Sequence, residues 1–181
     1  LVGHSFGATV VLALAVQRPD LARTLVLFEP VYFGLLNDAG HRTFNSSLAQ
    51  ERPFNDAIER GDMMAAAEAF LTRWGLPGEW EAMPEVAKEV MASRMWLIPA
   101  QSDGIINEGP KRMKLDAICN LNVPTLVMHG DKSPMIMEAI TEVISGAIPN
   151  GQGDVLNGAG HMLPITHHAE CANKLRVFWG L

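Results

Sequence analysis

Residues 1–15, LVGHSFGATVVLALA, decide the fold. Gly3-His4-Ser5-Phe6-Gly7 matches Gly-x-Ser-x-Gly, the pattern of a sharp strand-to-helix turn that presents a nucleophilic serine. The apolar residues before it are typical of a strand end, and residues 8–17 are typical of a helix packed on a sheet. A simple glycine-rich turn is the alternative, but this context favours the nucleophile. Gly3 and Gly7 are expected to give the turn room, and the Phe6 N–H to be one oxyanion donor.

Short apolar runs at residues 24–28, 125–129 and 154–156 predict strands buried on both faces, as in a parallel sheet. Helices are predicted over residues 134–145, with Ser133 as the N-cap, and over residues 169–179. The middle of the chain predicts helices instead, over residues 62–74, 82–95 and 111–119. The expected fold is therefore α/β, a parallel sheet flanked by helices. Residues 1–33 and 121–181 form its core, and residues 34–120 an inserted helical cap or lid.

Composition excludes several classes of function. The net charge is -6, whereas a nucleic-acid-binding surface needs an excess of lysine and arginine. No run approaches the roughly 18 apolar residues of a membrane span. Cys119 and Cys171 have neither metal-ligand nor redox-motif spacing, so we expect reduced thiols, a cytoplasmic location, and no metal or cofactor.

Gly158-Ala159-Gly160-His161 is the second chemical signal. A serine hydroxyl is a weak nucleophile at neutral pH and needs an adjacent base, and histidine titrates in the right range. His161 lies in a loop after the last predicted strand, so it is the candidate base. The alternative is that His161 is a solvent-exposed loop histidine without a catalytic role. The other histidines are better candidates for a non-catalytic role, since His4 is held in the turn and His129 lies within a strand.

Four stretches resemble the α/β-hydrolase superfamily: LVGHSFGATVVLALA, TLVLFEPV, VPTLVMHGDKSP and GAGHMLPITH. The resemblance implies a partial α/β-hydrolase fold with a helical cap, in which Ser5 is the nucleophile and His161 the base. It places the second oxyanion donor in a loop after an earlier strand. We therefore expect the chain to be a C-terminal portion that needs the N-terminal part of the same fold as its partner.

The catalytic acid departs from the common pattern. Most members of the superfamily carry an aspartate three positions after Gly130, and that position here is Ser133. Glu29, after the strand that follows the turn, is the favoured substitute, because some members such as haloalkane dehalogenases place the acid there. Asp131 is the alternative, although it lies two residues too early, a displacement of about 6 to 7 Å. Either carboxylate can serve, because geometry defines a triad.

The sequence thus predicts a serine hydrolase, esterase- or lipase-like, that cleaves an ester, thioester or similar acyl bond of a small molecule through an acyl-serine intermediate. A serine at position 5 argues against the haloalkane dehalogenases and epoxide hydrolases of this fold, which use aspartate. A non-catalytic ligand-binding protein and an acyltransferase remain as alternatives. Bulky apolar residues of the cap are expected mainly to form its own core and partly to shape the acyl pocket: Met63, Met64, Phe70, Trp74, Trp80, Met91, Met95 and Trp96.

Overall fold

A four-stranded parallel sheet organises the computed structural model, which describes residues 1–106 and 112–181. The strands lie in the order β1 (Val2–His4), β2 (Leu25–Phe28), β3 (Thr125–Gly130) and β4 (Gly151–Leu156). His4 is level with Phe28, and Phe28 with Met128. The residues that follow neighbouring strands therefore emerge side by side at one edge. The predicted parallel sheet with flanking helices is confirmed.

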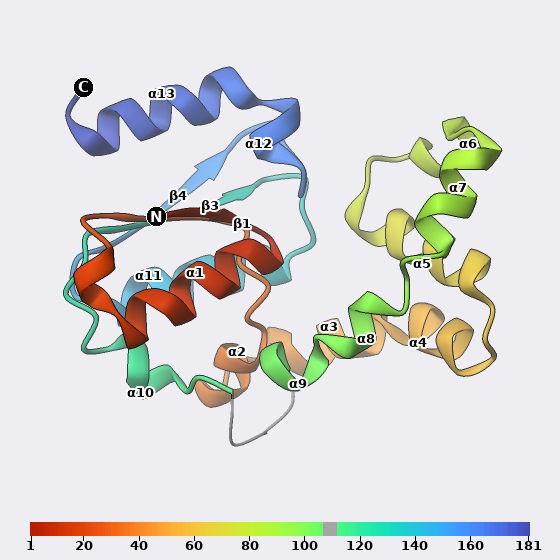
Figure 1. Cartoon of the computed structure of the whole chain (residues 1–181), viewed down its shortest axis with the longest axis horizontal. Helices are drawn as coiled ribbons and strands as arrows, with labels where there is room; N and C mark the ends of the chain where they lie inside the picture. The colour runs from red at the N-terminus through yellow and green to blue at the C-terminus, as the bar shows by residue number, and fades with distance from the viewer. Residues whose placement is uncertain (107–111) are drawn as a thin grey trace.

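Helices cover both faces of the sheet (Figure 1). On one face lie α1 (Phe6–Gln17), which ends before a short 3₁₀ turn at Pro19–Leu21, and α11 (Ile136–Ala147). On the other lie α12 (Leu163–Thr166) and α13 (His168–Trp179). Successive side chains of a strand point to opposite faces. Leu25 and Leu27 accordingly join the core under α1 and α11, while Val26 and Phe28 pack with Cys171 of α13. This two-sided burial explains the uninterrupted apolar run.

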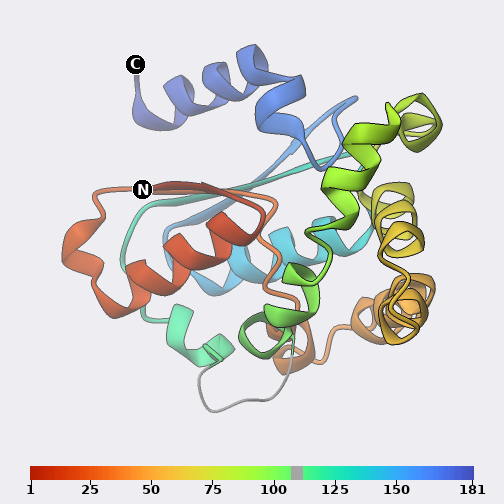
Figure 2. The same cartoon turned by 45° about the vertical axis from the view of Figure 1, so that its right-hand side comes forward.

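A helical insertion separates β2 from β3 and extends beyond the ends of the strands (Figures 1 and 2). Its first helices share the main core through Leu35, Leu36 and Phe44, whereas α4, α5 and α7 enclose a separate apolar cluster. No helix in the described part of the chain is long and apolar enough to cross a membrane. The helices of the insertion are α2 (Gly34–Asp38), α3 (Thr43–Gln50), α4 (Arg52–Glu59), α5 (Met63–Trp74), α6 (Glu79–Ala82), α7 (Glu85–Ala92), α8 (Leu97–Ala100), α9 (Ser102–Ile105) and α10 (Leu115–Ile118).

Several predicted helices have different boundaries in the structure. The helix expected over residues 82–95 is shorter and spans Glu85–Ala92; it starts late because Met83 is extended, as residues before a proline tend to be. The helix expected from residue 134 begins at Ile136 with Met135 as its N-cap, so the prediction that Ser133 caps it is wrong. The helix expected over residues 111–119 contains α10, and its first residue lies outside the described residues.

A buried ion pair joins the first helix of the insertion to the segment near its end. The Arg112 side chain is fully buried and donates from Nη2 to Asp38 Oδ1 at 2.6 Å and from Nη1 to Oδ2 at 3.1 Å. The Leu115 N–H also donates to Asp38 at 3.1 Å. Burial alone would raise the pKa of Asp38, but these hydrogen bonds and the charges of Arg112 and Lys114 outweigh it and lower that pKa. The pair therefore links α2 to the segment that returns to the sheet.

Replacing one partner of this pair should destabilise the fold. Arg112→Met removes the buried guanidinium that donates to both Asp38 oxygens and leaves only the more distant Lys114 ammonium, 3.9 Å away. We expect a loss of about 3–5 kcal/mol in urea unfolding. Because the pKa of folded Asp38 is lowered, the wild-type advantage should be present above pH ~4 and should disappear as the pH falls through the lower folded value. The double variant Arg112→Met/Asp38→Leu should recover most of the loss. An unchanged unfolding midpoint for Arg112→Met would contradict this role.

Candidate active site

Ser5 occupies a strained turn between β1 and α1. Its φ of 55° and ψ of -126° lie where residues other than glycine are uncommon. The Ser5 N–H donates to the Phe28 carbonyl at 2.9 Å, which anchors the turn on β2. A Cβ on Gly3 would lie 2.6 Å from Ala8 Cα, so only glycine lets the helix pass this close. A Cβ on Gly7 would meet no described atom within 4 Å, so the expectation that Gly7 provides room is wrong.

The N-terminus of α1 begins directly after Ser5. Phe6 is the first residue of this helix, and N–H groups in a first turn have no acceptor within their own helix. The helix dipole also favours negative charge at this end. Phe6 lines the same pocket as Ser5. Its N–H is therefore a donor that has no acceptor within its own helix, at the end of the helix where negative charge is favoured.

Ser5, His161 and Glu29 form one hydrogen-bonded chain. His161 Nε2 lies 3.0 Å from Ser5 Oγ, and His161 Nδ1 lies 2.5 Å from Glu29 Oε2. Ser5 is part-exposed, His161 is almost buried and Glu29 is fully buried. The order of contacts, hydroxyl to imidazole to carboxylate, is the one that activates a serine.

The second carboxylate oxygen of Glu29 is held by the last residue of β3 and by the loop after it. Glu29 Oε1 accepts from the Gly130 N–H at 2.8 Å and from Ser133 Oγ at 2.5 Å. A fully buried carboxylate is tolerated when hydrogen-bond donors surround it. Ser133, the position at which the family resemblance implied an aspartate, thus donates to a carboxylate that follows the neighbouring strand.

Asp131 does not contact His161 in this structure. Its Oδ1 accepts from the Gly158 N–H at 2.6 Å, and its Oδ2 lies 3.3 Å from Lys132 Nζ. A Cβ on Gly130 would lie 2.1 Å from the Ala159 carbonyl oxygen, so the loops after β3 and β4 touch through their backbones. Asp131 therefore fastens the loop that carries His161.

Two further side chains contact His161, and sequence reasoning did not predict either contact. His4 Nε2 donates to the His161 carbonyl at 2.7 Å, and the Trp74 ring centroid lies 5.0 Å from the His161 ring centroid. Burial lowers the pKa of His4, and the hydrogen bond to His161 opposes this only in part. His4 is therefore a neutral donor near pH 7. Its place beside Ser5 in the motif was an available signal. Trp74 was expected only among the apolar residues that form the insertion's core or shape the pocket, and nothing in the sequence placed it against His161.

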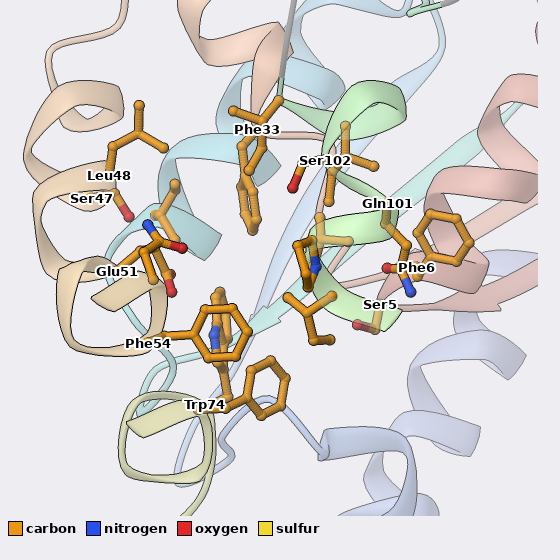
Figure 3. A pocket seen from close by; sticks show the side chains of 18 of the residues that line it. Ser5, Phe6, Phe33, Ser47, Leu48, Glu51, Phe54, Trp74, Gln101 and Ser102 are labelled. Carbon is orange, nitrogen blue, oxygen red and sulfur yellow. The ribbon is translucent and has the colours of Figure 1, made fainter. Parts of the chain in front are cut away.

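A pocket of about 150 Å³ opens beside Ser5 and His161 (Figure 3). Of the bulky insertion residues, Phe70 and Trp74 line it, while most of the others pack in the cluster of α4, α5 and α7. Trp96 is 59% exposed, so its expected place in that core is wrong. Within residues 1–106 and 112–181, no three histidine, cysteine, aspartate or glutamate side chains gather to hold a metal ion.

The sheet order, the strained serine turn and the inserted helices define an α/β-hydrolase fold. A family model described as alpha/beta hydrolase fold matches residues 1–168, and the chain belongs to this family. The resemblance found in the sequence is thereby confirmed.

Individual relatives agree with this assignment. A 2-hydroxymuconate semialdehyde hydrolase of Pseudomonas putida is 27% identical over 184 residues, which cover 98% of this chain and 61% of that protein. The chain thus spans about three fifths of this relative's length. Lipase 3 of Moraxella sp. (strain TA144) is 36% identical over 61 residues, 34% of this chain and 19% of that protein.

Solved structures share the fold at low sequence identity. MGS-M2, an α/β hydrolase from a Medee basin deep-sea metagenome library, superposes with a TM-score of 0.74 at 15% identity and covers 99% of this chain and 64% of its own. The esterase EaEST from Exiguobacterium antarcticum has a TM-score of 0.71 at 16% identity, with coverages of 98% and 65%.

The partner of His161 can be tested by proton NMR. A strong hydrogen bond from Nδ1–H to a buried carboxylate should shift that proton far downfield of the amide region. We expect this resonance in the wild type, its loss or a marked upfield shift in Glu29→Gln, and its retention in Asp131→Asn. The opposite pattern in the two variants would show that Asp131 is the partner.

Proposed function

We propose that the protein is a serine hydrolase that cleaves an ester, thioester or similar acyl bond through an acyl-serine intermediate. The observation that carries the proposal is the chain Ser5–His161–Glu29, with contacts of 3.0 and 2.5 Å at the mouth of an apolar pocket. The hydrolase of Pseudomonas putida, 27% identical over nearly the whole chain, and the Moraxella lipase support a hydrolytic activity.

The geometry fits acylation of Ser5. His161 Nε2 takes the hydroxyl proton as Ser5 Oγ attacks the acyl carbonyl carbon. The carbonyl oxygen becomes negative, and the Phe6 N–H donates to it. Glu29 holds the imidazole in the tautomer that accepts at Nε2 and stabilises the imidazolium that forms. His161 then gives its proton to the leaving alcohol or thiol as the carbon–heteroatom bond breaks.

Deacylation uses the same groups with water as the nucleophile. His161 removes a proton from water, the hydroxide attacks the acyl-serine carbonyl, and the ester bond to Ser5 Oγ breaks. The proton on His161 passes to Ser5 Oγ, which regenerates the hydroxyl and releases the carboxylic acid. The apolar walls around Phe33, Phe54 and Trp74 suit the acyl part of such a substrate.

Labelling with a fluorophosphonate tests the activated serine directly. We expect one covalent adduct by intact mass, located on Ser5 by peptide mapping, on the protein expressed from its own gene. Ser5→Ala, as the matched control, should give no adduct, and Glu29→Gln should label at least 100-fold more slowly, because losing the triad carboxylate typically costs about 10⁴-fold.

The absence of an adduct on a folded protein would refute the hydrolase and favour a ligand-binding protein. Label on another serine would also refute it. If Ser5 is labelled, an ester assay with an added alcohol separates hydrolysis from acyl transfer, since a transferase would form the new ester in preference to the free acid.

A further inference from the structure

The pocket ends in polar side chains at its far side from Ser5. Ser47 and Glu51 line it there, while Phe33, Phe54 and Trp74 lie between them and Ser5 (Figure 3). Ser47 comes from α3, and Glu51 directly follows that helix. Ser47 is only 5% exposed. A pocket for a plain hydrocarbon chain would gain nothing from a buried hydroxyl and a carboxylate at its end, because both groups must give up water.

Arg73 of α5 orients these two side chains from behind. Its guanidinium forms an ion pair with Glu51 Oε1 at 2.5 Å and donates to Ser47 Oγ at 2.6 Å and to Gln50 Oε1 at 2.6 Å. Arg73 does not itself line the pocket. Since the Ser47 oxygen already accepts from Arg73, the hydroxyl proton is the group that Ser47 can offer to a ligand.

Glu51 supplies an acceptor beside this donor. Arg73 Nε contacts Oε1. Within the described residues, no hydrogen bond to Oε2 is found. Burial raises the pKa of Glu51, and the charge and hydrogen bonding of Arg73 oppose that rise. The far end of the pocket thus presents a hydroxyl donor and a carboxylate acceptor, and the Asn55 amide, one helical turn after Glu51, also lines the pocket.

We propose that this polar end of the pocket, Ser47 and Glu51, selects acyl groups that carry a neutral hydrogen-bonding group, a hydroxyl or a primary amide, at the end remote from the scissile bond. The inference rests on the proposed function and names its substrate class. A hydroxyl can accept from Ser47 and donate to Glu51, whereas an alkyl end leaves both groups desolvated and unpaired.

A remote carboxylate is disfavoured for an electrostatic reason. It would meet the Glu51 carboxylate at the pocket wall, while the charge that could attract it, on Arg73, lies behind and is committed to Glu51, Ser47 and Gln50. Like charges in a partly buried site repel with little screening. The expected order of substrates is therefore hydroxyl first, alkyl second and carboxylate last.

Three esters of equal length test this order: methyl 6-hydroxyhexanoate, methyl hexanoate and monomethyl hexanedioate, each with its eight-carbon homologue. We expect kcat/KM for the hydroxy ester to exceed that for the alkyl ester by about tenfold, the value of a good hydrogen bond to a charged group. Ser47→Ala should bring that ratio close to one. Glu51→Gln should raise the carboxylate ester relative to the hydroxy ester by about tenfold, because the repulsion is removed.

Asn45→Ala is the matched control, since Asn45 is exposed on α3 and does not line the pocket. It should leave all three ratios unchanged. Ratios in Ser47→Ala and Glu51→Gln that equal those of the wild type would overturn the subsite and leave the hydrolase intact. The same esters titrated calorimetrically into Ser5→Ala measure binding without turnover. The same order of affinity supports the subsite even if no ester is hydrolysed, and equal affinities overturn it.

Discussion

The buried carboxylate of Glu29 is the interaction on which the site depends. It has no exposed surface and receives hydrogen bonds from Gly130, Ser133 and His161. These donors come from the end of β3 and from the loops after β3 and β4. A carboxylate this deep is stable only while its donors stay in place. The register of β2 on β3, the short loop after β3 and the position of His161 are therefore fixed together, and Ser5 is held to the same strand end by its bond to Phe28.

Short sequence patterns predicted two parts of the site, the turn at Ser5 and the position of Glu29 at the end of a strand. The motif around Ser5 identified a strained turn, and its positive φ follows from the strand-to-helix geometry. The strand that ends at Phe28 placed Glu29 at the right edge. Spacing alone could not choose between Glu29 and Asp131, because both follow strands that end at that edge. The choice depends on which side chain turns toward His161, and that is a property of the folded loops.

Ser133 shows why the remaining contacts escaped sequence reasoning. A serine before Pro134 is a typical helix cap. The helix begins later, however, and the Ser133 hydroxyl donates to Glu29, which follows the neighbouring strand. The contact joins residues 104 positions apart, so no local signal announces it. The same holds for Trp74 beside His161, and for Arg73 behind Ser47, since both depend on how the insertion folds back.

Helix α5 connects the two ends of the pocket. Its consecutive residues Arg73 and Trp74 serve different places: Arg73 orders the polar end, and Trp74 packs against His161. The Asp38–Arg112 ion pair closes the insertion that carries this helix. The position of the insertion thus sets both the lining of the pocket and the surroundings of His161.

The central claim is that Glu29 supplies the triad carboxylate. It is tested most directly by measuring activity after that carboxylate is removed from position 29 and introduced at position 133. Ser133 Oγ lies 2.5 Å from Glu29 Oε1, so an aspartate at position 133 would place its carboxylate close to the same point. The account predicts that Glu29→Ala abolishes Ser5 labelling and ester hydrolysis, and that adding Ser133→Asp restores a measurable part of both. Full activity of Glu29→Ala, with loss of activity in Asp131→Asn, would contradict it.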